Sequence, residues 1–159
     1  MAKHLIDSNV YIDFLRSGKF HAAITGLYAE YTPNLYFSSV VIEELLAGTR
    51  SLTERKSVEL LYLPFEQAGR ILTPSHAHWR TTGDVLARIF REQPASRSKI
   101  PQVVADCLIA MSARDIGATV LHEKSGRLRA DPTFPAFSPC RAGVRDNPPP
   151  TFSATSPKV

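Results

Sequence analysis

Three acidic positions in apolar surroundings could together form a site for a divalent metal ion. They are Asp7, the pair Glu43 and Glu44, and Asp106. Carboxylates that cluster repel one another, and each raises the pKa of its neighbours. A bound Mg²⁺ or Mn²⁺ removes that penalty, because both ions accept ligands that are all oxygen. Such an ion can activate a water molecule and stabilise negative charge on a phosphodiester oxygen, so these positions point to metal-assisted hydrolysis.

Asp7 stands at the end of the first predicted strand, Lys3–Ile6. Ligands of open parallel sheets bind beyond the carboxyl ends of the strands, which favours a functional role for Asp7. The alternative is a helix N-cap, since aspartate, serine and asparagine all favour that position. On its own, Asp7 fits both interpretations equally well.

Glu43 and Glu44 lie in a predicted helix that follows a strand. At about 100° per residue, the two glutamates fall on opposite flanks of the apolar face, so periodicity does not choose between them. A pair of solvated glutamates without a function is the alternative interpretation. The apolar face consists of Val41, Ile42, Leu45 and Leu46.

Asp106 is the only charged residue between Lys99 and Arg114. An unpaired charge is costly to bury, so a carboxylate in such surroundings indicates either a functional site or a structural salt bridge. The helix around Asp106 is expected to bury one stripe, formed by Val104, Leu108 and Met111.

Alternating strands and helices are predicted for residues 3–122, and these elements would position the acids. The strands are Lys3–Ile6, Leu35–Phe37, Arg70–Thr73 and Ala118–Leu121, and the helices are Asn9–Arg16, His21–Glu30, Val40–Ala47, Thr53–Leu63, Ala77–Glu92 and Gln102–Arg114. Ser39 is the expected cap of the third helix, and Gly48 fits its C-terminal end. Strands separated by helices predict an α/β fold with a parallel sheet covered on both faces.

The length and composition are those of one globular domain. The chain has 159 residues, of which 43% are hydrophobic and 21% are charged. No apolar stretch approaches the roughly 20 residues of a membrane span, and Asp7 comes before any signal-peptide core, which predicts a cytoplasmic protein. Cys107 and Cys140 are expected to be free thiols. The net charge of +4 permits a polyanionic partner without requiring one.

Two further groups of residues have weaker functional potential. His76 and His78 face apart at the start of a helix, so a solvated pair is expected rather than a metal site. Seven basic residues could contact phosphates, although a solvated basic surface explains them equally well. They are Arg50, Arg55, Lys56, Arg88, Arg91, Arg97 and Lys99.

Three motifs, in their order and spacing, resemble those of the PIN-domain ribonucleases, most closely the VapC-type toxins of bacterial toxin–antitoxin pairs. The motifs are LIDSNVYID from Leu5, SSVVIEELLAG from Ser38 and DCLIAMSA from Asp106, the last followed by GATVL from Gly117. The resemblance covers residues 3–124. It implies a PIN-like three-layer sandwich in residues 1–130, with helices on both faces of a central parallel β-sheet.

The same resemblance implies an activity and its partners. The activity is that of an endoribonuclease toxin that depends on Mg²⁺ or Mn²⁺ and cleaves RNA. The implied partners are a cognate antitoxin and a second copy of the chain in a homodimer, with no membrane involved.

The resemblance also assigns the site residues, position by position. Asp7 and Asp106 match the first and third acids of the family, which are both catalytic and metal-binding. The family's second acid directly precedes a leucine in the helix that ends at glycine, which favours Glu44 over Glu43. Ser8 or Asn9 matches the small polar residue beside the first acid, which can hold a water of the metal ion.

The sequence departs from the family after the last predicted strand, where Thr-x-Asn-x-x-Asp-Phe usually supplies a fourth acid. Residues 121–128 lack this motif, and the substitutes, Glu123 and Asp131, are not at the family's offset. A shift of reading frame near residues 124–126 would account for the loss. The alternative function is therefore a catalytically impaired PIN-like binding module.

Residues 131–159 are expected to form an irregular tail, either disordered or frame-shifted. Seven of the 12 prolines lie in residues 132–159. Proline neither donates ladder hydrogen bonds nor fits a helix interior. Without a further strand, the edge of Ala118–Leu121 would stay open.

Overall fold

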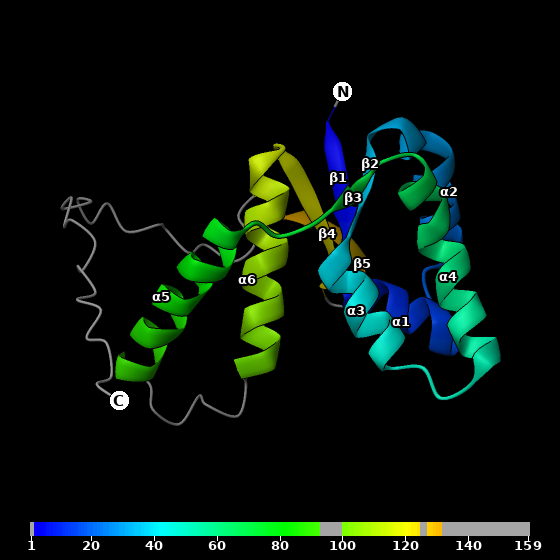
Figure 1. Cartoon of the computed structure of the whole chain (residues 1–159). Helices are drawn as coiled ribbons and strands as arrows, with labels where there is room; N and C mark the ends of the chain where they lie inside the picture. The colour runs from blue at the N-terminus through cyan, green and yellow to red at the C-terminus, as the bar shows by residue number, and fades with distance from the viewer. Residues whose placement is uncertain (1, 93–99, 125–126, 132–159) are drawn as a thin grey trace, which may run out of the picture.

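A five-stranded sheet lies at the centre of the described part of the chain (Figure 1). The computed structural model describes residues 2–92, 100–124 and 127–131. In spatial order the strands are β3 (Ile71–Leu72), β2 (Leu35–Ser38), β1 (Lys3–Ile6), β4 (Ala118–Lys124) and β5 (Arg127–Asp131). The first four of these run parallel, which confirms the predicted parallel sheet, and β5 is antiparallel to β4.

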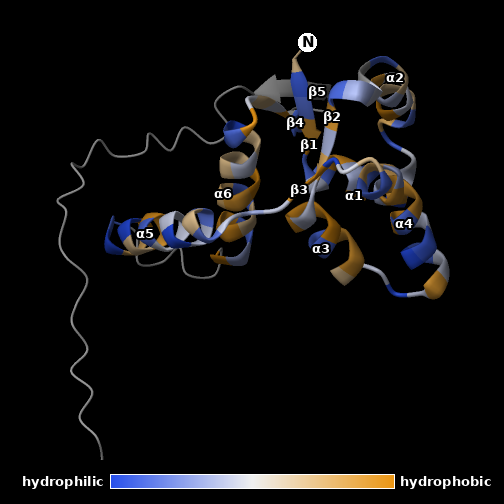
Figure 2. Cartoon of the chain, turned by 45° about the horizontal axis from the view of Figure 1, so that its top comes forward, coloured by the Kyte–Doolittle hydropathy of each residue, from blue (hydrophilic) through white to orange (hydrophobic). Residues whose placement is uncertain are grey.

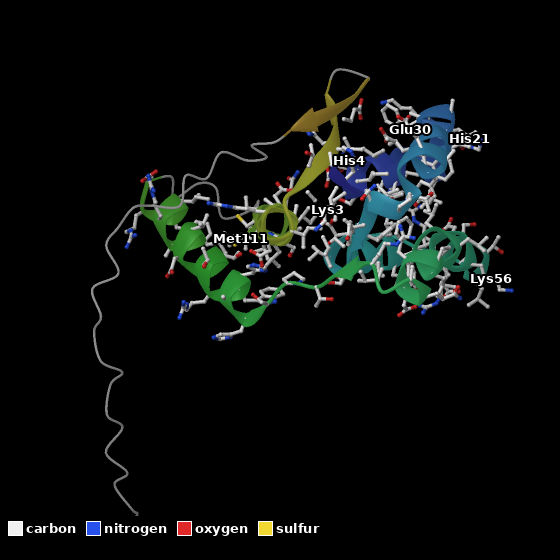
Figure 3. The ribbon with its side chains drawn as sticks, turned by 90° about the horizontal axis from the view of Figure 1, so that it is seen from above. Lys3, His4, His21, Glu30, Lys56 and Met111 are labelled. Carbon is white, nitrogen blue, oxygen red and sulfur yellow. The ribbon has the colours of Figure 1, made fainter. Side chains whose placement is uncertain are left out.

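Helices lie on both sides of this sheet. They are α1 (Ser8–Ser17), α2 (His21–Tyr31), α3 (Ser39–Ala47), α4 (Leu52–Gln67), α5 (His76–Glu92) and α6 (Ile100–Asp115), and the short 3-10 helix η1 (Thr32–Asn34) precedes β2. Seen from above, Met111 of α6 lies on one side of Lys3 in β1, and Lys56 of α4 lies on the other side (Figure 3). The chain therefore forms the expected three-layer α/β sandwich. None of the described helices combines the length and the apolar character that crossing a bilayer requires.

Ser38 links β2 directly to α3 and fixes where this helix starts. Its backbone is still extended, and its buried hydroxyl accepts a hydrogen bond from the N–H of Val40 at 3.2 Å. The cap is thus Ser38, and the prediction of Ser39 is wrong by one residue. At the other end, the N–H of Gly48 donates to the carbonyl of Glu44, as its predicted place after the helix suggests.

Helix α4 continues through Pro64, although the sequence predicts an end at Leu63. Proline in a helix removes one hydrogen bond, which here is outweighed by burial of the next residue. Phe65 is only 3% exposed, and its ring lies 5.5 Å from the ring of Phe37. Packing against the core therefore extends the helix beyond its local signal.

Strand β5 closes the edge that the sequence analysis expects to be open. Ala130 pairs with Leu121, and Asp131 pairs with Val120. The expectation of an open edge is therefore wrong. The signal for this strand was present, because charged residues alternate with Leu128 and Ala130 at the period of two that an edge strand shows. The remainder of the expected tail, residues 132–159, lies outside the described residues.

The buried face of α6 also differs from the predicted stripe. Leu108 is buried as expected, but Val104 and Met111 are only half-buried. Small residues complete the buried face instead, because α6 packs against β4 and also against α5 and α3. They include Ala105, Ser112 and Ala113.

The aromatic core between β2 and the neighbouring helices centres on Phe37. Its ring stacks on Tyr11 of α1 with 4.8 Å between ring centroids, and Tyr62 of α4 lies 6.3 Å away. Phe37 is 1% exposed. In Figure 2, much of α3 and the end of β1 have the colour of hydrophobic residues. Val41 and Leu45 of α3 belong to the same buried cluster, which therefore holds α1, α3 and α4 against the sheet and positions Asp7 and Glu44.

Replacing Phe37 with alanine tests this core. The variant F37A should lower the free energy of unfolding by about 3–5 kcal/mol, because it removes a fully buried ring and leaves a cavity. Urea denaturation followed by circular dichroism measures the change. The matched control is L60A, since Leu60 is 75% exposed, and it should change stability by less than about 0.5 kcal/mol. Equal effects of the two substitutions would contradict this account of the core.

Candidate active site

Asp7 lies at the carboxyl end of β1 and begins α1. Its N–H donates to the carbonyl of Leu121 in β4 at 2.9 Å, and the residue is 3% exposed. One carboxylate oxygen accepts from the N–H of Ser8 at 2.8 Å, and the other accepts from the side-chain amide of Asn9 at 3.2 Å. Asp7 is thus the N-cap of α1. Because the cap lies at the ligand-binding edge of the sheet, the capping role does not exclude the functional one.

Glu44 points inward from α3, whereas Glu43 is exposed. One oxygen of Glu44, Oε2, is buried and has no hydrogen-bond partner among the described residues. A buried acceptor without a partner is costly, which makes this oxygen a natural ligand for a cation. The structure therefore separates the two glutamates that periodicity leaves equivalent.

Asp106 is half-buried on α6 and feels the charges of the other two acids. Burial, the largest cause, and the negative charges of Asp7 and Glu44 together raise the pKa of Asp106 to about 6. Since like charges act in this way only at short range in a partly buried site, α6 brings Asp106 to the same region as the acids of β1 and α3.

The pKa values of the other two acids shift for the same physical reasons. Burial raises the pKa of Asp7, and the hydrogen bonds from Ser8 and Asn9 and the charge of His122 oppose that rise. Burial also raises the pKa of Glu44, as does the charge of Asp7, while a hydrogen bond with the Ser8 side chain lowers it. Ser8, which is 6% exposed, therefore interacts with two of the three acids.

A divalent cation fits this donor set. The three acids supply only oxygen ligands, and Glu44 presents a buried oxygen that lacks a partner. No group of three or more histidine, cysteine, aspartate or glutamate side chains within residues 2–92, 100–124 and 127–131 already has the arrangement of a metal site. Carboxylates that repel one another stay apart, so an ion would bind with rotation of these side chains.

The two possible substitutes for the fourth acid lie on β4 and β5. Glu123 forms an ion pair with Lys19 at 2.7 Å, and Lys19 also contacts Asp13 at 3.3 Å. Glu123 is not among the charges that shift the pKa of Asp7, Glu44 or Asp106. The backbone of Asp131 pairs with Val120, two strands away from β1.

His122 is a residue near the acids that the sequence analysis misses. It is half-buried at the carboxyl end of β4, and its charge lowers the pKa of Asp7. Its closeness depends on the register between β1 and β4, which no local pattern in the sequence reveals.

The other polar candidates lie in structural contacts. His78 is buried, and its Nε2 contacts Asp115 at 2.9 Å while Nδ1 accepts from the N–H of Ser75. The expectation of a solvated pair is therefore wrong for His78, although His76 is exposed.

Two of the basic residues proposed for phosphate contact form ion pairs along their own helices. The pairs are Arg55–Glu59 and Arg88–Glu92. Arg97 and Lys99 lie outside the described residues.

A hollow of about 560 Å³ adjoins the acids between α1, α3 and α4. Its apolar lining includes Ile12, Leu15 and Val58. Arg16 and Arg50 also line it, and Glu44 belongs to both the hollow and the acidic site. An extended segment with apolar and charged side chains could therefore occupy the hollow and reach the acids.

Residues 4–127 match the family model of the PIN domain. No curated protein matches the sequence. The fold resembles a chain of the crystal structure of DNA-bound VapBC from Salmonella typhimurium, with a TM-score of 0.52 and 22% identity, over 77% of this chain and 86% of that chain. It also resembles a chain of FitAB bound to the IR36 DNA fragment, with a TM-score of 0.50 and 22% identity, over 74% of this chain and 82% of that chain. At this level of identity the likeness shows a shared fold.

The raised pKa of Asp106 predicts a pH-dependent effect of the substitution D106N. The ordinary pKa of 3.8 rises to about 6 in the fold. The native state therefore binds this proton more tightly than the unfolded chain does, and that stabilisation is lost as the pH rises through about 6. In the presence of a chelator, D106N should raise the melting temperature by a few degrees at pH 7.5 and leave it nearly unchanged at pH 4.

Differential scanning fluorimetry at both pH values measures this difference. The matched control is D84N, because Asp84 is exposed on α5 and lies outside the acidic site. A lower melting temperature of D106N at pH 7.5 would show that Asp106 is held by a stabilising ion pair instead.

Proposed function

The chain belongs to the PIN-domain family, and on that premise we propose that it is a divalent-metal-dependent endoribonuclease, the toxin of a bacterial toxin–antitoxin pair. The observation that carries the proposal is the electrostatic coupling of Asp7, Glu44 and Asp106, which come from three different elements. Carboxylates that lie close enough for the charge of one to raise the pKa of another form a site that a bound cation stabilises. A nuclease of this kind uses such a cation to act on phosphodiesters.

The three acids are the proposed catalytic and metal-binding residues. A divalent ion at this site supplies a Lewis acid for the phosphodiester and lowers the pKa of an attacking water. Asp7 is held in one orientation by the N–H of Ser8 and the amide of Asn9. The Ser8 hydroxyl supports Glu44 in the same way.

RNA as the substrate and Mg²⁺ or Mn²⁺ as the ion are the finer parts of this proposal. The net charge of +4 is compatible with a polyanionic substrate. All-oxygen ligands favour Mg²⁺ or Mn²⁺ over ions that prefer sulfur. We propose a cytoplasmic location, because an RNA substrate and a cognate antitoxin would be met there. We propose residues 1–130 as the catalytic domain. Strand β5 ends one residue later, at Asp131.

A cognate antitoxin and a second copy of the chain are the proposed partners. The two similar structures are those of VapBC and FitAB, each bound to DNA. In this chain, the hollow beside Glu44 is lined by apolar side chains and by charges of both signs, including Arg16, Arg50 and Glu54, which suits a peptide segment with apolar and charged side chains. A segment in that hollow would cover one of the three acids and so block access to the site.

The second candidate function is a PIN-like binding module with impaired catalysis. It is favoured by one observation, the ion pair between Lys19 and Glu123 at 2.7 Å, which engages a possible fourth acid. Such a module would keep the antitoxin and dimer contacts and would lack cleavage.

Substitution of single acids tests the nuclease. The variants D7N, E44Q and D106N should each reduce RNA cleavage at least about 100-fold. Loss of a residue that only orients a metal ligand already lowers activity about 10- to 100-fold, and loss of the ligand itself should lower it at least as much. E43Q is the matched control, since Glu43 is the exposed neighbour on the same helix. Cleavage of a labelled single-stranded RNA with added Mn²⁺ or Mg²⁺ measures the rates.

Other outcomes of the same assay would contradict the proposed nuclease. Cleavage that continues in excess EDTA would refute the metal mechanism, and equal losses in E43Q and E44Q would refute the assignment of the second acid. Full binding of a partner by a chain that never cleaves RNA would favour the binding module.

Blocking the hollow tests the partner. Ser57 lines the hollow and is exposed, so S57R should weaken binding of the antitoxin at least about tenfold by filling the space. T53R is the matched control, because Thr53 lies one turn earlier on α4 and does not line the hollow. Co-expression with the product of the neighbouring short gene, followed by titration of the purified proteins, measures the affinity. Unchanged affinity in S57R would place the antitoxin elsewhere.

A further inference from the structure

His122 lies next to Asp7 across two strands. β1 and β4 are parallel, with Ile6 opposite Leu121, and the hydrogen bond from the N–H of Asp7 to Leu121 continues this ladder. The next residues in register are therefore Asp7 and His122. Neighbours in register on adjacent strands have their backbones about 4.8 Å apart and their side chains on the same face.

The surroundings of His122 are those of a residue in the site. The side chain is half-buried, and its Nδ1 atom is shielded from solvent. Its charge also influences the carboxylate of Asp7, which agrees with the distance expected from the register. Glu123 follows on β4, and side chains alternate along a strand, so Glu123 belongs to the opposite face and pairs with Lys19.

His122 lies at the start of the segment in which the family has its fourth acid. The family motif after the last strand supplies that acid, and residues 121–128 of this chain do not contain it. The imidazole of His122 is a nitrogen donor that the fold brings to Asp7 at this edge of the sheet. A set of three carboxylates and one imidazole differs chemically from a set of four carboxylates, because imidazole binds transition-metal ions, the later ones such as Co²⁺ more strongly than Mn²⁺, and contributes little to binding of Mg²⁺.

We propose that His122 is a fourth protein ligand of the divalent ion bound by Asp7, Glu44 and Asp106, and that its imidazole makes the site prefer Mn²⁺ and Co²⁺ to Mg²⁺. This inference rests on the proposed function, since it assumes that the three acids hold an ion. It also specifies that function, because it names the feature that selects the ion.

Calorimetric titrations of the full chain with Mg²⁺, Mn²⁺ and Co²⁺ test the inference without any assay of cleavage. H122N should weaken binding of Mn²⁺ and Co²⁺ about tenfold or more and binding of Mg²⁺ less than about threefold. The visible absorption of bound Co²⁺ should change as well, because a nitrogen ligand is lost. H76N is the matched control, since His76 is exposed on α5, and its titrations should equal those of the wild type. Melting temperatures of the variants show whether each one is folded.

Each outcome decides the question. Selective loss of Mn²⁺ and Co²⁺ binding in H122N supports the proposal. Equal weakening for all three ions would show that His122 only positions Asp7, and unchanged binding would show that it is no ligand, so either result overturns the inference. If D7N abolishes ion binding in the same experiment, the proposed function survives that failure. A wild-type chain that binds none of the three ions would overturn both.

Discussion

The repulsion between three partly buried carboxylates is the constraint on which the rest of this structure depends. Burial is the largest cause of the raised pKa in Asp7, Glu44 and Asp106 alike, and the charge of Asp7 raises the pKa of both Glu44 and Asp106 further. Such an arrangement destabilises the fold, so the surrounding packing must hold it in place. The aromatic core around Phe37 and the buried face of α6 provide that packing.

The parallel sheet determines where the repulsion is concentrated. The carboxyl ends of β1 and β2 lie at one edge, where Asp7 follows β1 and Ser38 turns the chain from β2 into α3. Each of these residues caps a helix, so the same local chemistry that starts α1 and α3 also orients the acids. Hydrogen bonds to Asp7 lower the cost of its charge, whereas Oε2 of Glu44 has no such partner among the described residues. The unpaired oxygen marks the place where a cation would stabilise the site most.

The basic residues near the acids have different roles. Lys19 neutralises Glu123 and Asp13 outside the acidic centre. Arg16 and Arg50 line the hollow that shares Glu44 with the site. His122 faces Asp7 from the next strand. A partner or substrate can therefore reach the three acids from the side of α1, α3 and α4. On the side of β4, the side chain of His122 lies next to Asp7.

The sequence by itself determined the α/β architecture, the parallel order of its main strands and the candidate acids Asp7 and Asp106, because these follow from local apolar runs and their spacing. The motif resemblance favoured Glu44 over Glu43. Because both glutamates lie at the flanks of the apolar face of α3, only the packing of this helix supplied a physical reason for that choice. Tertiary structure alone decided that His78 is buried, that Glu123 pairs with Lys19, and that β5 covers the edge of β4. It also placed His122 beside Asp7. Periodicity describes one element at a time, whereas the register between strands far apart in the chain depends on how the whole core packs.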